Sequence, residues 1–150
     1  LIKNELIDDH KFGTVGAVAI DKNGNIASGT STGGMTNKKY GRIGDVPIIG
    51  AGTYANNETC GISATGTGEY FIRTVAAHEV SSLIKYKGVT PANALNEVLF
   101  KQIGPLGGEG GMILLDKYGE VYWDFNSTGM FRGYKKSNGE NNVKMFEKTE

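Results

Sequence analysis

The sequence predicts an α+β fold in which a β-sheet carries a layer of helices on one face. A turn pattern of Asp, Lys, any residue and Gly occurs at residues 21–24 and again at 116–119, each time between strand-like apolar runs. Between these two hairpins, residues 69–99 carry apolar side chains at helical spacing. Because no segment of the chain is expected to cover the other face of the sheet, we expect a second sheet from a partner segment to lie there.

The first hairpin spans residues 14–32, and its turn decides which side chains face each other. A three-residue loop with Gly24 in the left-handed conformation sets Thr14 opposite Thr32 on one face. A two-residue loop would set Thr14 opposite Gly33 and turn Thr32 to the other face. The Asp-x-Asn-Gly order favours the first register. The first strand is an apolar run typical of a strand that is covered on both faces.

The region between the hairpins is expected to form two helices. The first is predicted over Glu69–Lys87, with Gly88 as its stop signal. Thr90 and the proline after it predict the start of the second helix. Gly104 and the proline that follows predict its end, before a glycine-rich stretch leads into the second hairpin.

Composition narrows the classes of function. The 150 residues include 16 basic and 16 acidic side chains, so no large field of one sign is available for nucleic acid or an anionic membrane. No apolar run reaches the ~18 residues of a bilayer span. The single cysteine, Cys60, excludes an intrachain disulfide and a cysteine-based metal cluster, and it fits a reducing, cytoplasmic compartment. Because the chain starts at Leu1 and not at Met, we expect a longer precursor, whose own N-terminus would carry any export signal.

The pair Gly13-Thr14 is the first candidate for chemistry. A threonine hydroxyl becomes a good nucleophile when a base removes its proton. If the bond before Thr14 is cut, the freed α-amine can be that base, because its reference pKa of about 7.7–8.0 suits work near neutrality. Gly13 tolerates the strained backbone that self-cleavage by an N-to-O acyl shift requires. Thr32 in the favoured register can hold the nucleophile, although each of these residues alone is more often an ordinary strand residue.

Two further groups of residues carry a chemical signal. Arg42 and Asp45 lie three residues apart and can bind the carboxylate and the ammonium of an amino acid, although a surface ion pair is the commoner explanation. Thr65 and Gly66, in the run Thr-Gly-Thr-Gly-Glu, can stabilise an oxyanion, although a helix cap is commoner. A phosphate-binding loop is disfavoured because the Gly-Lys-Ser/Thr ending is absent from this run.

The order and the amino-acid sequences of these segments resemble those of one known family. The stretches that carry the likeness are GTVGAVAIDKNGN, TSTGGMTNKKYGRIGDVPIIGAGTYANN, SATGTGE, GPLGGEGGMILLDKYGEV and FNSTGMFRG. Together they cover most of residues 13–133, and they closely resemble the β subunit of plant-type isoaspartyl peptidases/L-asparaginases, which are threonine-type N-terminal-nucleophile hydrolases.

The resemblance implies an organisation in two subunits. A precursor cleaves itself before Thr14, so Leu1–Gly13 would be the end of the α subunit and residues 14–150 the β subunit, the catalytic half. The fold implied is a four-layer αββα sandwich that the missing α subunit completes, and active members resemble dimers of αβ units, (αβ)2. No cofactor is implied, and no metal site is expected in this chain, since the family's structural sodium would lie in α.

The resemblance also assigns roles around the nucleophile. Thr14 matches the nucleophile that acts through its own freed amine, and Gly13 precedes the self-cleaved bond. Thr32 matches the threonine that hydrogen-bonds the nucleophile. Thr65 and Gly66 match the oxyanion hole. The implied reaction is attack on the side-chain carbonyl of asparagine or a β-aspartyl dipeptide, which gives an acyl ester on Thr14 that water hydrolyses to release aspartate.

The head of the substrate is assigned in the same way. Arg42 matches the residue that holds the α-carboxylate, and Asp45 matches the residue that holds the α-ammonium, with the Gly68 carbonyl assisting. The family often has serine after the Arg-x-Gly-Asp motif, whereas this chain has Val46. We expect this departure to change the pocket wall and not the chemistry.

Three rival interpretations stay open. A glycosylasparaginase would favour histidine where Thr67 stands. The sequence Met-Thr-Asn-Lys at residues 35–38 favours the isoaspartyl branch. A protein-cleaving threonine protease suits the Arg42 and Asp45 pair less well. A zymogen-like amino-acid-binding protein would keep that pair and never free Thr14, which fits the presence of residues 1–13 and Thr14 in one chain.

Overall fold

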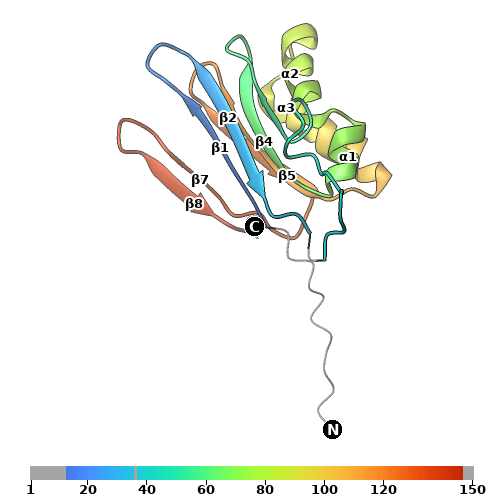
Figure 1. The fold of residues 1–150 in the computed structure, drawn as a ribbon. Coiled ribbons are helices and arrows are strands. Elements are labelled where there is room, and N and C mark those ends of the chain that lie inside the picture. Colours follow the sequence, from blue (N-terminus) through green and yellow to red (C-terminus); the bar gives the residue numbers. More distant parts are fainter. Residues whose placement is uncertain (1–12, 36, 147–150) are drawn as a thin grey trace.

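The computed structural model describes residues 13–35 and 37–146, so the segment Leu1–Gly13, expected to end an α subunit, lies outside the described part except for Gly13. Its main antiparallel sheet has the strand order β3-β4-β5-β6 (Figure 1). The bounds of these strands are Thr53–Ala55, Cys60–Gly66, Gly110–Asp116 and Val121–Phe125. The predicted hairpin around residues 116–119 is confirmed, whereas the pairing of β3 with β4 was not expected from the sequence.

The helices all pack on one face of the main sheet (Figure 1), as predicted. They are α1 (Gly68–Arg73), α2 (Ala76–Lys87) and α3 (Pro91–Asn96), followed by a π-helical segment (Glu97–Ile103) and a 3-10 turn (Gly104–Leu106). The predicted helix-end signals are confirmed. Gly88, which ends α2, is left-handed with φ +64°, and at the start of α3 Oγ1 of Thr90 accepts a hydrogen bond from the N–H of Asn93 at 3.3 Å. Within the described ranges, no helix is both long and apolar enough to cross a bilayer.

The single helix predicted over residues 69–87 is wrong in one respect, because it breaks between α1 and α2. Val75 adopts a left-handed conformation, φ +47° and ψ +47°, which β-branched residues rarely do. The break turns the first turn of α2 toward the loop before β3, where two of its N–H groups donate to the carbonyl oxygens of Gly50 and Ala51, at 2.8 and 3.2 Å. The apolar spacing continues across the break and therefore conceals it.

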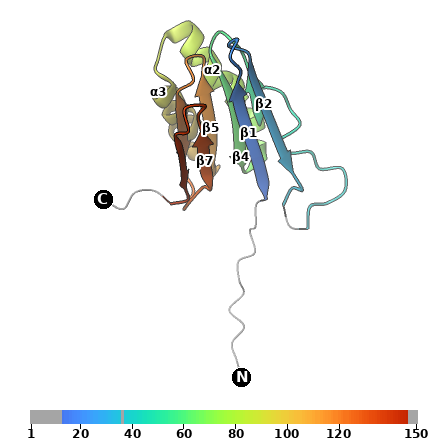
Figure 2. The ribbon, with the colours of Figure 1, turned by 90° about the vertical axis from the view of Figure 1, so that its left-hand side faces the viewer.

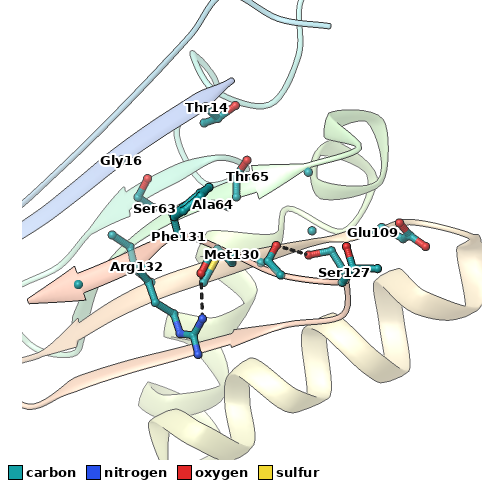
Figure 3. Close-up of a pocket in the computed structure, with 17 residues that line it drawn as sticks. Thr14, Gly16, Ser63, Ala64, Thr65, Glu109, Ser127, Met130, Phe131 and Arg132 are labelled. Atoms are coloured by element: carbon teal, nitrogen blue, oxygen red, sulfur yellow. Dashed lines mark hydrogen bonds between the residues drawn. The ribbon is translucent and has the colours of Figure 1, made fainter. Parts of the chain in front are cut away.

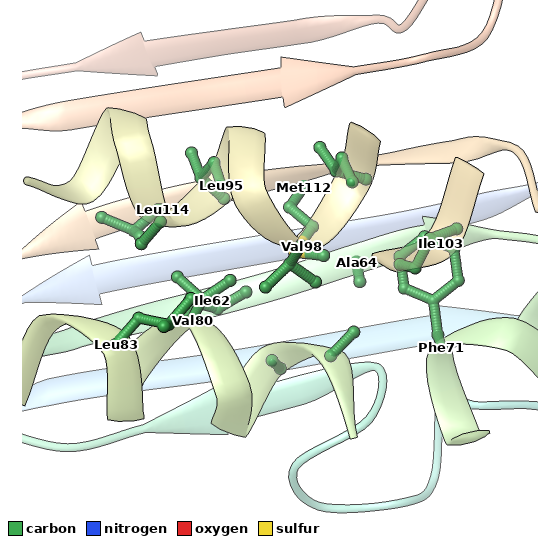
Figure 4. Close-up of a cluster of buried hydrophobic side chains, with 14 of the residues drawn as sticks. Ile62, Ala64, Phe71, Val80, Leu83, Leu95, Val98, Ile103, Met112 and Leu114 are labelled. Carbon is green, nitrogen blue, oxygen red and sulfur yellow. The ribbon is translucent and has the colours of Figure 1, made fainter. Parts of the chain in front are cut away.

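The hydrophobic core lies between the main sheet and the helices (Figure 4). Its largest fully buried side chains include Ile62, Phe71, Val80, Leu95, Val98, Leu99, Ile103, Met112 and Leu114. Burial of one such side chain contributes roughly 1.5–3 kcal/mol to stability. This apolar contact is what holds the helical layer on the sheet.

The first hairpin lies on the opposite face of the main sheet, which corrects the expectation that nothing in this chain covers that face (Figure 1). Its strands are β1 (Thr14–Ile20) and β2 (Ile26–Thr32). Oγ of Ser28 donates to the carbonyl oxygen of Ile62 on β4 at 2.5 Å, and Oγ1 of Thr30 lies 2.6 Å from Oγ of Ser63. The layers approach closely because Gly16 faces Ser63, and a Cβ on Gly16 would collide with the serine hydroxyl.

The turn of the first hairpin has the predicted three-residue form. Gly24 has φ +83° and donates its N–H to the carbonyl oxygen of Asp21 at 3.0 Å, while the N–H of Asp21 donates to the carbonyl oxygen of Asn25 at 2.9 Å. This geometry confirms the register in which Thr14 pairs with Thr32. One part of the prediction is not met, since Val15 on the outer face of β1 is 69% exposed in the described chain and not covered on both sides.

A third hairpin, β7 (Arg132–Lys135) and β8 (Asn141–Lys144), lies on the same side of the main sheet as β1 and β2 (Figure 2). The Arg132 guanidinium lies over the rings of Phe125 and Trp123, at 4.7 and 5.4 Å from their centroids, and so ties β7 to β6. Among residues 13–35 and 37–146, β1 pairs only with β2 and β7 only with β8. The edges of β1 and β7 that face each other are therefore unpaired in this part of the chain (Figures 1 and 2).

Candidate active site

Thr14 is the first residue of β1, and the hairpin register brings it against the end of β2. Oγ1 of Thr14 donates a hydrogen bond to Oγ1 of Thr32 at 3.1 Å. Thr32 in turn donates to the carbonyl oxygen of Gly13 at 3.1 Å and accepts from the N–H of Gly34 at 2.9 Å. Thr32 therefore links the hydroxyl of Thr14 to the carbonyl group of the residue before it.

Thr65 and Gly66 end β4 close to the start of β1. Thr14 and both of these residues line a cavity of about 630 Å³, which lies between β1 and the segment 127–133 that leads into β7 (Figure 3). Gly66 packs so closely on β5 that a Cβ there would lie 2.7 Å from the Cα of Gly110. Only glycine fits at this point, so the close approach of β4 to β5 at the edge of the cavity depends on Gly66.

Arg42 lies in the loop between β2 and β3, and its partner is Glu69 in the first turn of α1. Oε1 of Glu69 accepts from Nε of Arg42 at 3.0 Å and from Nη2 at 2.5 Å. The commoner explanation considered from the sequence, a surface pair of Arg42 with Asp45, is thus not the ion pair that forms. Glu69 received no role from the sequence, where its only signal was the last position of the Thr-Gly-Thr-Gly-Glu run.

Asp45 is buried, with only 4% of its surface exposed. Glycines surround its carboxylate: a Cβ on Gly68 would lie 2.5 Å from Oδ1, and one on Gly52 would lie 2.8 Å from Oδ2. Burial raises the pKa of Asp45, while its own backbone N–H and Arg42 act in the opposite direction. Oδ2 is buried without a hydrogen-bond partner in the described structure, at a typical cost of about 1–3 kcal/mol. The site is therefore arranged to receive a hydrogen-bond donor.

A small cavity of about 30 Å³ joins the threonine pair to these charged residues. Its lining residues are Gly13, Thr14, Thr32, Gly34, Met35, Lys38, Arg42, Gly44, Asp45, Val46, Gly66 and Gly68. Seven of the eight site residues predicted from the sequence are in this set, and the eighth, Thr65, lines the larger cavity that shares Thr14 and Gly66. The fold thus gathers all the predicted residues around Thr14, although their chemical roles stay predictions. Lys38 is a lining residue that received no role from the sequence.

Other reactive groups of the described chain lie outside this site. Burial raises the pKa of the Cys60 thiol to about 11, so the group is a neutral core thiol at neutral pH. His78 packs edge-on against the ring of Tyr54, with ring centroids 5.2 Å apart, and lines neither cavity. In the described ranges, no three His, Cys, Asp or Glu side chains gather closely enough to hold a metal ion.

Comparisons with known proteins find relatives of one kind. An isoaspartyl peptidase of Salmonella typhimurium is 53% identical over 129 residues, which are 86% of this chain and 41% of that protein. One from Escherichia coli is 50% identical over 129 residues, 86% of this chain and 40% of the relative. A probable isoaspartyl peptidase/L-asparaginase 2 of Arabidopsis thaliana is 47% identical over 134 residues, 89% of this chain and 40% of the relative. The chain thus spans about two fifths of the length of the curated relatives it matches.

The sequence model of one protein family, Asparaginase_2, described as asparaginase, matches residues 2–145. The match covers nearly the whole sequence and includes the hairpins β1–β2 and β5–β6, the loop that carries Arg42 and Asp45, and the end of β4. This chain therefore belongs to the asparaginase family.

Proposed function

We propose that this chain is the catalytic part of a threonine-type hydrolase that cleaves L-asparagine and β-aspartyl dipeptides to release L-aspartate. The observation that carries the proposal is the small cavity, in which a hydrogen-bonded threonine pair lies beside Arg42 and the buried, unpartnered Oδ2 of Asp45. The relatives, named isoaspartyl peptidase and probable isoaspartyl peptidase/L-asparaginase, support the same assignment.

The first step in this proposal is self-cleavage between Gly13 and Thr14. The Thr14 hydroxyl attacks the Gly13 carbonyl carbon, the C–N bond breaks as a C–O ester forms, and the proton moves to the nitrogen. Water then hydrolyses the ester, which leaves a carboxylate on Gly13 and a free α-amine on Thr14. The contact of the Thr32 hydroxyl with the Gly13 carbonyl oxygen supports this step, because a donor at that oxygen stabilises the negative charge that develops there.

Turnover then uses the freed amine as the base for the same hydroxyl. Thr14 Oγ1 attacks the side-chain carbonyl of the substrate while the α-amine accepts the proton, and Thr65 with Gly66 stabilises the oxyanion. The C–N bond breaks, and ammonia or an amino acid leaves with that proton. Water releases aspartate from the ester on Thr14. Thr32 keeps the hydroxyl oriented through the bond at 3.1 Å.

The amino-acid head of the substrate is assigned to the charged side of the small cavity. Arg42 binds the α-carboxylate, since Glu69 fixes the guanidinium from its Nε and Nη2 edge. Asp45 and the Gly68 carbonyl bind the α-ammonium, which supplies the donor that Oδ2 lacks. Val46 forms part of the wall, in place of the family's usual serine.

The lining of the small cavity supports a link between cleavage and substrate entry. The cavity adjoins Thr14 and the charged residues Arg42 and Asp45, so it is where the amino-acid head of a substrate would enter. Gly13 is one of the lining residues. We infer that separation of Gly13 from Thr14 opens this cavity, which would make the uncleaved chain a zymogen.

Residues 14–150 are assigned in this proposal to a β subunit, completed by an α subunit that ends near Gly13. The unpaired edges of β1 and β7 lie on either side of the larger cavity, and Val15 is 69% exposed on the outer face of β1. Added strands would pair these edges and added helices would cover that face, which yields a four-layer αββα sandwich. The relatives are longer than this chain, which supports the existence of such an α subunit. We propose an (αβ)2 assembly for the active form.

Intact mass and N-terminal sequencing of the incubated full-length protein test the proposal, together with an assay for released aspartate. We expect a fragment that begins TVGAVA, and aspartate from both L-asparagine and a β-aspartyl dipeptide. Faster hydrolysis of a glycosylated asparagine would favour a glycosylasparaginase instead. An uncut chain that binds aspartate without turnover would overturn the hydrolase and leave an amino-acid-binding zymogen.

A further inference from the structure

Two groups of residues line the small cavity together with Thr14. Arg42, Asp45 and Gly68 are assigned above to the amino-acid head of the substrate. The end of β2 and the turn after it contribute the second group, in which Lys38 is the charged residue. A substrate whose head binds the first group and whose scissile carbonyl lies at Thr14 must extend its leaving group away from that head.

The structure places the ammonium group of Lys38 close to the nucleophile pair. The N–H of Lys38 donates to the carbonyl oxygen of Met35 at 3.1 Å, and the side chain folds back over Gly34. A Cβ on Gly34 would lie 3.2 Å from Nζ of Lys38 and 3.3 Å from its Cε. The N–H of the same glycine donates to Oγ1 of Thr32 at 2.9 Å. Gly34 therefore lies between the Lys38 side chain and the hydrogen-bonded threonine pair.

The charges of the cavity match one class of substrate better than the other. Its lining includes two cations, Lys38 and Arg42, and one carboxylate, Asp45. Glu69, outside the lining, pairs with Arg42. A β-aspartyl dipeptide has two carboxylates and one ammonium, so it offers a second carboxylate that Arg42 does not bind, whereas asparagine has one of each. Arg42 and Asp45 are sufficient for asparagine, which leaves Lys38 without a substrate group to bind.

We propose that Lys38 binds the free α-carboxylate of the leaving amino acid and so favours β-aspartyl dipeptides over L-asparagine. This inference rests on the proposed function and adds a determinant of specificity to it. Lys38 is exposed, so the ion pair is screened by solvent and salt. We therefore expect a contribution of about fivefold in kcat/KM at low salt, close to the upper end for exposed pairs.

The test compares three substrates of the matured full-length protein: β-aspartyl-glycine, the same dipeptide with a C-terminal amide, and L-asparagine. The wild-type protein should prefer the free carboxylate over the amide by about fivefold, and the preference should shrink as ionic strength rises. K38M should lose that preference and leave kcat/KM for the amide and for asparagine within about twofold. K38R should keep the preference, and K39M, which removes the neighbouring exposed cation outside the cavity, should behave as wild type.

The outcomes separate this inference from the proposal on which it rests. No preference for the free carboxylate in the wild-type protein would overturn the role of Lys38 without any variant, and so would an equal loss on all three substrates in K38M. A wild-type protein that cleaves itself but hydrolyses none of the three substrates would overturn the proposed function, and with it this inference.

Discussion

The two faces of the main sheet are packed in opposite ways. Toward the helices, Ile62 and Leu114 are fully buried in an apolar core. Toward the first hairpin, the contacts are hydrogen bonds and close backbone approaches, such as the pair of Thr30 with Ser63 at 2.6 Å. Alternation along β4 separates the two, because successive side chains of a strand point to opposite faces. One strand thus contributes stability on one side and positions Thr65 for the proposed chemistry on the other.

Loss of the proposed nucleophile, Thr14, should abolish the chemistry and leave the apolar packing unchanged. In T14A there is no hydroxyl to attack Gly13 or substrate, so we expect an uncut chain and a loss of turnover on the order of 10⁴-fold or more. Mass spectrometry and an aspartate assay measure both effects. The melting temperature should stay close to that of an uncut wild-type chain. A T14A protein that is still cut at the same bond, and so yields a fragment beginning AVGAVA, would exclude Thr14 as the nucleophile.

A cavity in the core should have the converse effect. Leu95 of α3 is fully buried, so L95A should lower the free energy of unfolding by about 2–5 kcal/mol. Denaturant unfolding measures this, with L106A as the matched control because Leu106 is 37% exposed and should change stability far less. The kcat of the folded L95A fraction should remain near wild type, and a large fall in kcat would show that the two sides are coupled.

Asp45 should show a conflict between stability and binding. Its pKa is raised by burial, so its charged form is disfavoured in the folded state and its stability contribution, present at low pH, is lost as pH rises through that pKa. D45N should therefore be more stable than wild type by about 1 kcal/mol at pH 7, and this gain should vanish well below pH 3.8.

The same substitution should weaken substrate binding, because D45N removes the negative charge that is proposed to bind the substrate ammonium. We expect KM to rise on the order of 10²-fold, as for loss of one partner of a buried charged pair. Unfolding curves at several pH values and steady-state kinetics measure the two effects. A stabilised D45N protein with an unchanged KM would contradict the role of Asp45 but not its burial.

The smallest expected effect concerns the strained helix break. Val75 is a β-branched residue in the left-handed region, and glycine adopts that conformation without penalty. V75G should therefore raise the free energy of unfolding by about 0.5–1 kcal/mol, despite the extra entropy of glycine in the unfolded chain. V89G is the control, because Val89 has no left-handed backbone strain to relieve. The V89G substitution should therefore lower the free energy of unfolding. A destabilised V75G would mean that the Val75 side chain contributes more by packing than its backbone costs.

Local rules predicted the parts of the site that depend on neighbours in the sequence. The turn at Asp21–Gly24 determines the hairpin register by its own hydrogen bonds, so the contact of Thr14 with Thr32 was predictable. Thr90 and Gly88 were predictable helix signals for the same reason. Glu69 was not, because its bond to Arg42 joins segments that are 27 residues apart, and nothing local indicates the pairing.

By itself, then, the sequence determined the hairpins β1–β2 and β5–β6, the helix caps and the family, since these depend on turn chemistry, glycine conformations and the residues of short motifs. Only the tertiary structure decided that β1 and β2 leave the main sheet for its second face, and that the helix breaks at Val75. Both depend on contacts between distant segments: the hydroxyls of β2 against β4, and the first N–H groups of α2 against the Gly50 loop. Such contacts outweigh local propensity because they satisfy backbone groups that would otherwise be buried without partners.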